Sequence, residues 1–163
     1  MEQLWAPWRM DYIKRTDTPP SDCVLCNKLN DADGLLVYKG ERAYVMMNLY
    51  PYNNGHVMIS PIHHISDFDE LPVETQTEIM NLATTLMRFM RKEMNAEGFN
   101  MGANIGKAGG AGIDEHFHFH VVPRWNGDTN FMPVVGNTKV HVQGLADTYA
   151  DLKPLFNNLE ISS

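Results

Sequence analysis

Five short stretches of the chain are rich in apolar, β-branched or aromatic residues, and the last two also alternate apolar with polar positions. These stretches span residues 35–39, 43–48, 56–60, 99–105 and 116–122. Alternation with a period of two is typical of strands that bury one face. Gly40 and Glu41 are placed to form a tight turn between the first two stretches. Pro61 and Pro123 close the third and the fifth. We therefore expect five strands.

A different spacing between residues 73 and 94 predicts one long amphipathic helix. Its apolar residues recur at intervals of three and four, and they are Ile79, Leu82, Ala83, Leu86, Met90 and Met94. Pro72 stands just before its start, a position that proline favours. A second, short helix is expected over residues 146–156. Because strands mostly follow strands, with one long helix inserted, the order of elements predicts an α+β fold with an antiparallel sheet.

The 163 residues are expected to form a single domain, 1–163. Within it we distinguish an aromatic and basic N-terminal arm (1–22), a core that carries the motifs (23–124) and a C-terminal extension (125–163). A net charge of -7 argues against nonspecific binding to nucleic acid or to anionic membranes. No apolar run approaches the roughly 20 residues of a membrane span, and the first residues lack the apolar segment of a signal peptide. We therefore expect a cytoplasmic protein.

The stretch DEHFHFHVVPRW, residues 114–125, places three histidines at alternate positions. On a strand His116, His118 and His120 would share one face, while Phe117 and Phe119 would point into a core on the other. Three interpretations compete: the histidines are metal ligands, they are catalysts, or they are tolerated on a half-exposed strand. Three histidines in register beside a glycine-rich loop (106–112) argue against the last.

A second candidate metal site lies near the N-terminal end of the motif-bearing core. Cys23 and Cys26 have the two-residue gap that lets two thiolates bind one tetrahedral zinc ion. Two more ligands would be needed, and one of His63 and His64, together with His116, would supply them. That arrangement would leave His118 and His120 free for chemistry. A redox pair and two packed thiols remain alternative interpretations of the cysteines.

GHVMISPIHH (55–64) followed by HFHFHVVPR (116–124) resembles the histidine triad (HIT) superfamily of nucleotide hydrolases and transferases. The flanking LWAPWRMDYI (4–13), the paired cysteines and PRWNGDTNFMP (123–133) resemble its bacterial diadenosine tetraphosphate (Ap4A) phosphorylase-like branch. The resemblance implies a HIT-like fold whose sheet continues across a homodimer. An open sheet edge, which natural proteins usually cover, also favours a dimer.

The resemblance implies a role for each histidine of the triad. His118 would be the nucleophile, and His120 would hydrogen-bond the reacting phosphate. His116 and His64 fall where zinc-containing relatives keep ligands, which together with the cysteines gives a structural zinc bound by Cys23, Cys26, His64 and His116. No cofactor would be required for the chemical step.

The resemblance also implies a set of nucleotide-binding residues. Asn48 matches a position that holds ribose hydroxyls, and Asn104 matches a polar position that contacts phosphate. Where many members have Gly-Gln-Ser or Gly-Gln-Thr before the triad, this chain has Ala-Gly-Ile (111–113). The side-chain contacts there must therefore give way to backbone N–H groups, for which Gly112 and Ile113 are the candidates, or be lost. Trp125, directly after the triad strand, is either a core residue or, because of that position, a candidate for stacking on a base.

These observations leave more than one class of function open. The first is an enzyme that cleaves a nucleotide phosphoanhydride through a nucleotidyl-histidine. With inorganic phosphate as second attacker it would be a diadenosine polyphosphate phosphorylase, and with water a dinucleotide or phosphoramidate hydrolase. The second class is a nucleotide- or zinc-binding module without turnover. A zinc hydrolase that uses all three histidines is a further alternative.

Overall fold

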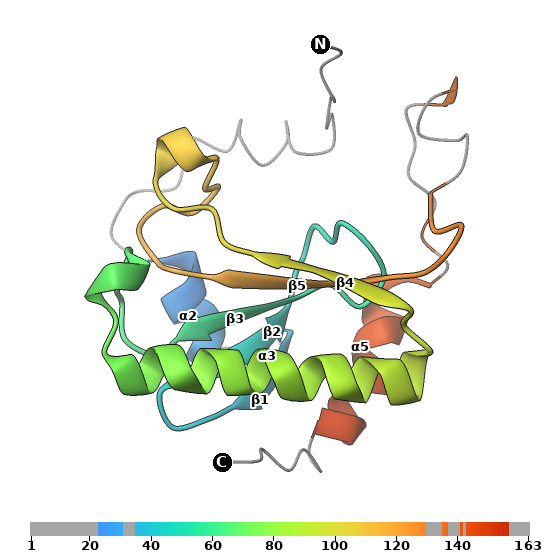
Figure 1. The fold of residues 1–163 in the computed structure, drawn as a ribbon, viewed down its shortest axis with the longest axis horizontal. Coiled ribbons are helices and arrows are strands. Elements are labelled where there is room, and N and C mark those ends of the chain that lie inside the picture. The colour runs from blue at the N-terminus through green and yellow to red at the C-terminus, as the bar shows by residue number, and fades with distance from the viewer. Residues whose placement is uncertain (1–22, 31–34, 130–134, 137–140, 142, 157–163) are drawn as a thin grey trace.

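A computed structural model describes residues 23–30, 35–129, 135–136, 141 and 143–156 of the chain. Its centre is a five-stranded antiparallel sheet in the order β1-β2-β3-β5-β4 (Figure 1). The strands are β1 (Leu36–Lys39), β2 (Ala43–Met47), β3 (Val57–Pro61), β4 (Gly98–Gly102) and β5 (Phe119–Arg124). The predicted α+β fold and number of strands are confirmed. The predicted arm, residues 1–22, lies outside the described residues.

The long helix α3 (Val73–Met94) crosses one face of the sheet (Figure 1). Its predicted bounds are confirmed. Its side chains that face the sheet are fully buried, and they are Ile79, Leu82, Ala83, Leu86 and Met90. Opposite them lie alternate residues of the strands, among them Val45, Val57, Ile59 and Val121. This interface is the main hydrophobic core. The residue after the helix, Asn95, adopts a left-handed conformation that caps α3.

The opposite face of the sheet carries a short helix, α2 (Val24–Asn30). Leu25 packs on Tyr44, Met46 and Met58 in a second, smaller hydrophobic cluster. The buried Tyr44 hydroxyl donates to the carbonyl oxygen of Leu25 at 3.0 Å and ties α2 to the sheet. The sequence pattern did not predict α2, because seven residues are too few to display helical periodicity.

The remaining helical segments lie at the edges of the sheet. The helix α5 (Leu145–Phe156) packs along β1, where Tyr149 and Lys153 donate hydrogen bonds to the carbonyl oxygen of Leu36. Two single 3-10 turns, η2 (Phe68–Glu70) and η3 (Lys107–Gly109), lie in the connections. None of the described helices is both long enough and apolar enough to cross a membrane.

The boundaries of all five predicted strands need correction, by one residue at one end in the first two. The third strand includes Pro61, although proline was expected to end it. The fourth spans Gly98–Gly102 and stops before residue 105. The fifth, predicted at 116–122, spans Phe119–Arg124 instead. Pro123 is tolerated within it because it lies beyond Val121, the last residue that pairs with β3.

The late start of β5 has a specific cause. The Ser60 hydroxyl donates to the carbonyl oxygen of Phe117 at 2.6 Å, and the Phe117 N–H donates to the carbonyl oxygen of Ile65 at 2.7 Å. The N–H and C=O groups of Phe117 therefore form hydrogen bonds outside the ladder between β3 and β5, and the strand begins only at Phe119. Phe117 nevertheless faces the main core, and His116 and His118 lie on the other side of the chain, as the alternation predicted.

Candidate active site and metal-binding cluster

His118 is buried, with only 6% of its surface exposed, and its ring orientation is fixed by the backbone. Its Nδ1–H donates to the carbonyl oxygen of His116 at 2.9 Å. In a neutral ring this bond leaves Nε2 without a proton and with a lone pair. Burial lowers the pKa of His118 below the ordinary value, which favours the neutral form. The ring is thus prepared to act as a nucleophile.

His120 belongs to a chain of oriented rings. The Tyr52 N–H donates to Nδ1 of His56 at 3.0 Å, so a neutral His56 carries its proton on Nε2. That Nε2 lies 3.0 Å from Nδ1 of His120 and donates to it. The proton of His120 is then on Nε2. The centres of the His118 and His120 rings are 5.1 Å apart. Nε2 of His118 therefore offers a lone pair, and Nε2–H of His120 offers a hydrogen-bond donor, to the same ligand.

The two histidines open into a cavity of about 130 Å³. Four of the predicted nucleotide-binding residues line it: Asn48, Asn104, Gly112 and Ile113. Apolar side chains and α2 complete the wall, with Val24, Leu25, Lys28, Met46, Leu49, Tyr50, Tyr52 and Met58. A mostly apolar cavity with a few converging polar groups is the usual form of a small-molecule site.

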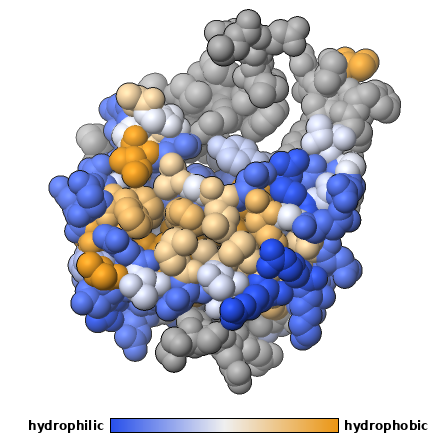
Figure 2. Space-filling model, in the orientation of Figure 1, coloured by the Kyte–Doolittle hydropathy of each residue, from blue (hydrophilic) through white to orange (hydrophobic). Residues whose placement is uncertain are grey.

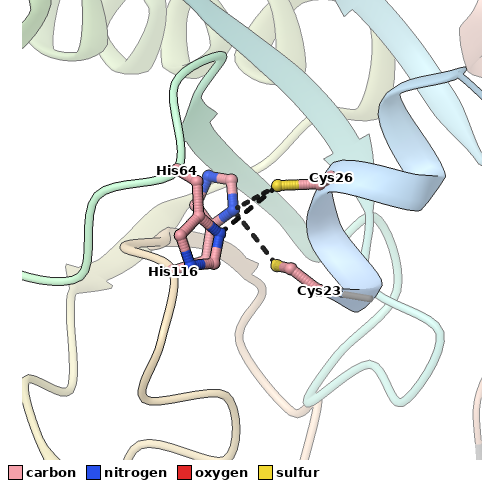
Figure 3. Close-up of side chains that lie close together, drawn as sticks. All are labelled: Cys23, Cys26, His64 and His116. Atoms are coloured by element: carbon pink, nitrogen blue, oxygen red, sulfur yellow. Dashed lines mark hydrogen bonds between the residues drawn. The ribbon is translucent and has the colours of Figure 1, made fainter. Parts of the chain in front are cut away.

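The four predicted metal ligands lie together (Figure 3). One ligand atom from each of Cys23, Cys26, His64 and His116 lies within 4.8 Å of the others. Nδ1 of His116 is 3.3 Å from the Sγ atoms of both cysteines, and Nδ1 of His64 is 3.4 Å from Sγ of Cys26. Tetrahedral zinc would separate sulfur and nitrogen ligands by about 3.5 Å. These four residues could therefore hold a metal ion.

The surroundings of the cluster also fit a metal. Nε2–H of His116 donates to the carbonyl oxygen of Pro61 at 2.9 Å, which leaves Nδ1 aimed at the cysteines. Such a bond to the second ring nitrogen is characteristic of histidine ligands. Burial and the neighbouring Cys23 raise the pKa of the Cys26 thiol to about 11. Without a cation, two thiolates so close together are unfavourable, whereas a bound metal would deprotonate both.

A hydrogen-bonded node supports the loop that carries His56. The carboxylate of Asp128 accepts a bidentate pair from Arg124 at 2.6 and 2.8 Å. It also accepts the Asn53 side-chain N–H at 2.7 Å, and Asn53 donates to the carbonyl oxygen of Pro123 as well. Gly55 adopts φ 72°, a left-handed conformation, directly before His56. The node therefore fixes the loop to the end of β5.

The structure does not bring Trp125 to the histidine-lined cavity. The Trp125 Nε1–H donates to the carbonyl oxygen of Met94 at 3.1 Å, and its ring packs against the main core. It lines a separate cavity of about 540 Å³ between the end of α3 and α5. The prediction for Trp125 rested on its position directly after the triad strand, but its ring packs against the core beneath α3 instead.

Sequence reasoning assigned no role to several residues of this site, among them His56, Leu25 and Lys28. His56 entered only as part of the GH motif, although it is fully buried and orients His120. Leu25 and Lys28 lie on α2 beside Cys26, and in that segment the sequence pattern pointed only to the two cysteines. The signal that could have found His56 is its place beside a glycine at the start of a strand next to the triad.

A model of the HIT domain matches residues 30–127, so the chain belongs to the HIT domain family. The expected fold is confirmed with it. The chain is similar to a protein named AP-4-A phosphorylase from Mycobacterium tuberculosis (strain ATCC 25618 / H37Rv). The two are 37% identical over 157 residues, which cover 91% of this chain and 80% of the relative.

Two further similarities bear on the site. A zinc-bound histidine triad family protein from Mycobacterium smegmatis has a similar structure, with a TM-score of 0.68 and 26% identity. The match covers 85% of this chain and 95% of the other. An adenosine 5'-monophosphoramidase from Candida albicans is 23% identical over 109 residues, which cover 64% of this chain and 71% of that protein.

Proposed function

We propose that the chain is a diadenosine polyphosphate phosphorylase that works through a nucleotidyl-histidine. The observation that carries this proposal is the paired orientation of His118 and His120, fixed by two hydrogen bonds of 2.9 and 3.0 Å, in the wall of a cavity that Asn48, Asn104 and Gly112 also line. The similarity to a named AP-4-A phosphorylase over most of both chains agrees with it.

In the first step Nε2 of His118 attacks the α-phosphorus of one nucleotide. A nitrogen–phosphorus bond forms, the bond to the bridging oxygen breaks, and ATP leaves from diadenosine tetraphosphate with the electron pair on that oxygen. The Nε2–H of His120 and the backbone N–H groups of Gly112 and Ile113 are the donors for the charged phosphoryl oxygens. An oxygen of inorganic phosphate then attacks the phosphorus, the nitrogen–phosphorus bond breaks, and ADP is released.

The walls of the cavity define how the nucleotide lies. With its α-phosphate at His118, the ribose reaches Asn48, whose side chain lies 3.5 Å from His56 Nε2. The base then lies against the apolar part of the cavity wall, to which Leu25, Met46 and Met58 contribute.

The two enzyme alternatives are separated by incubating the protein with diadenosine tetraphosphate, with and without inorganic phosphate. A phosphorylase gives ADP and ATP only when phosphate is present. AMP and ATP in plain buffer would instead identify a hydrolase. The similarity to a phosphoramidase is the observation that favours this alternative.

His118→Ala should lower activity by several orders of magnitude. His63→Ala, an exposed neighbour of the cluster, is the matched control and should retain it. A His118→Ala protein that cleaves at the wild-type rate would exclude the nucleotidyl-histidine mechanism. If the wild-type protein forms no product from any dinucleotide, the chain is instead a nucleotide-binding module without turnover.

The metal cluster is proposed to hold one structural zinc ion. Zinc would supply no step of the reaction; the four ligands would tie α2 and the loop at His64 to the start of the triad segment. Elemental analysis of protein purified without chelator should give about one zinc per chain. Cys23→Ser should lose the metal together with thermal stability. A metal-free protein of full stability would refute this part of the proposal.

We also propose a homodimer whose sheet continues across β4. This strand is an edge of the sheet, and Met101 on it and Ile105 after it are exposed. Figure 2 shows a broad apolar area on the side of the molecule where α3 and β4 lie. Light scattering at micromolar concentration should give twice the chain mass, and Met101→Asp should shift it to the monomer mass. A monomeric wild-type protein would contradict the dimer.

A further inference from the structure

The backbone of Pro61, the last residue of β3, points toward the triad segment. Next to β3 the Asn48 N–H donates to the carbonyl oxygen of His56 at 3.0 Å, and the Ile62 N–H donates to that of Arg42 at 2.8 Å. Both bonds lie on the β2 side. Because the direction of the backbone groups alternates from residue to residue, the even-numbered positions face β2 and the odd-numbered ones, Pro61 among them, face β5.

Phe117 lies where the ladder would place the partner of Pro61. Ile59 pairs with Phe119, so the same register, continued by two residues, brings Pro61 opposite Phe117. Proline has no N–H and cannot donate to the Phe117 carbonyl oxygen. The hydroxyl of Ser60 donates to that oxygen instead, at 2.6 Å. Because Ser60 is fully buried, this hydrogen bond is shielded from water.

The conformation of Phe117 decides where the ring of His118 lies. The hydrogen bond that fixes this ring runs from Nδ1–H of His118 to the carbonyl oxygen of His116 and spans Phe117. Both backbone groups of Phe117 are held from outside the triad segment. Its N–H donates to the carbonyl oxygen of Ile65 at 2.7 Å, and its carbonyl oxygen accepts from Ser60. Of these two partners, Ser60 contributes a side chain and can be tested by substitution.

We propose that Ser60 is a positioning residue for the attack by His118, because its hydroxyl replaces the strand donor that Pro61 lacks. This rests on the proposed function, in which Nε2 of His118 attacks phosphorus. The hydroxyl holds the peptide group that joins Phe117 to His118, and so keeps the ring within reach of the His116 carbonyl oxygen. Without it the Phe117 carbonyl oxygen is left buried without a donor and turns away, which moves the ring and releases its tautomer.

The tautomer of His118 tests the proposal without turnover. NMR of protein with isotope-labelled histidine distinguishes a ring nitrogen that carries a proton from one that does not, and His118→Ala identifies the signals. The wild type should show Nδ1–H and an unprotonated Nε2, whereas Ser60→Ala should show a mixture of both tautomers. Ser60→Cys, which is similar in size but has only a weak donor, should show the same change and serves if Ser60→Ala does not fold.

Turnover gives the second readout. With diadenosine tetraphosphate and phosphate, Ser60→Ala should lower kcat about ten- to a hundredfold and leave KM and the dissociation constant of AMP within about twofold. Pro61→Ala, added to Ser60→Ala, supplies the missing N–H, so the double variant should recover part of kcat and the Nδ1–H tautomer. Leu86→Ala, at a fully buried position on the α3 side of the sheet, is the control. It should lower stability and leave both the tautomer and kcat unchanged.

Three results would overturn the inference. One is a His118 ring that stays entirely in the Nδ1–H form in both Ser60→Ala and Ser60→Cys. Another is a fall in kcat that is equal in Ser60→Ala and Leu86→Ala, which would reduce Ser60 to a role in stability. The third is a double variant that recovers nothing, because the hydroxyl would then not stand in for the N–H. If the wild type cleaves no dinucleotide, the proposed function fails while the tautomer still tests Ser60.

Discussion

Replacing Asp128 by asparagine should lower the free energy of unfolding by about 2 kcal/mol at neutral pH. The Asp128 side chain is 10% exposed and accepts five hydrogen bonds. An asparagine oxygen can keep those from the Asn53 side chain and the Trp125 N–H. Its NH2 group would face a nitrogen of Arg124, so one ionic hydrogen bond is lost and the other weakened.

The magnitude follows from the two bonds to Arg124. A hydrogen bond to a charged group contributes roughly 1.5–3 kcal/mol. Because the Arg124 side chain is 43% exposed, solvent screens the pair, and the lower part of that range applies. Loss of one such bond and weakening of the second give about 2 kcal/mol.

The pH dependence gives the prediction a second, independent signature. The Arg124 guanidinium holds the pKa of Asp128 well below its usual range, against the opposing effect of burial. The stabilisation by a carboxylate with a lowered pKa is complete above the unfolded-state value, about 3.9, and is lost as the pH falls below it. The difference in unfolding free energy between wild type and Asp128→Asn should thus be constant from about pH 5 to 7 and should shrink below about pH 4.

Urea unfolding followed by tryptophan fluorescence at several pH values measures this difference directly. Glu41→Gln is the matched control, because Glu41 pairs with Arg42 on the surface and is 87% exposed. It should change stability by less than about 0.5 kcal/mol at every pH. An Asp128→Asn protein as stable as the wild type at pH 7, or a difference that grows in acid, would refute the reasoning.

Three further changes test the core, the loop and α2. Leu86→Ala, which empties a fully buried position under the sheet, should cost about 2–5 kcal/mol in urea unfolding, and a loss below 1 kcal/mol would show that the site collapses around the gap. Gly55→Ala should cost about 1–2 kcal/mol, because φ is 72° and the new Cβ would lie 2.7 Å from Cε of Met94; an unchanged melting temperature would contradict this strain. Tyr44→Phe removes the bond to Leu25 and should cost about 1–2 kcal/mol in urea unfolding. It should also weaken AMP binding, whereas full affinity would show that this bond to α2 does not support the nucleotide site.

The sequence determined the features that follow from local periodicity. The spacing of Ile79, Leu82, Leu86 and Met90 located α3 at its observed bounds, because an apolar stripe with a period of 3.6 can be buried only by a helix. Alternation separated the faces of the triad segment in the same way, with Phe117 and Val121 in the main core. Residue spacing and family resemblance together identified the four residues that lie together and could hold a metal ion, although 38 to 93 positions separate the pairs in contact.

Only the tertiary structure decided the features that depend on partners distant in sequence. The fifth strand begins at Phe119 because the Ser60 hydroxyl and the Ile65 carbonyl oxygen take the backbone groups of Phe117 out of the ladder. His56 became part of the site through Tyr52 on one side of its ring and His120 on the other. Trp125 lies away from the cavity because its indole N–H finds a partner at the end of α3. Periodicity reports which face of an element is apolar, but the partner of a buried polar group depends on three-dimensional packing.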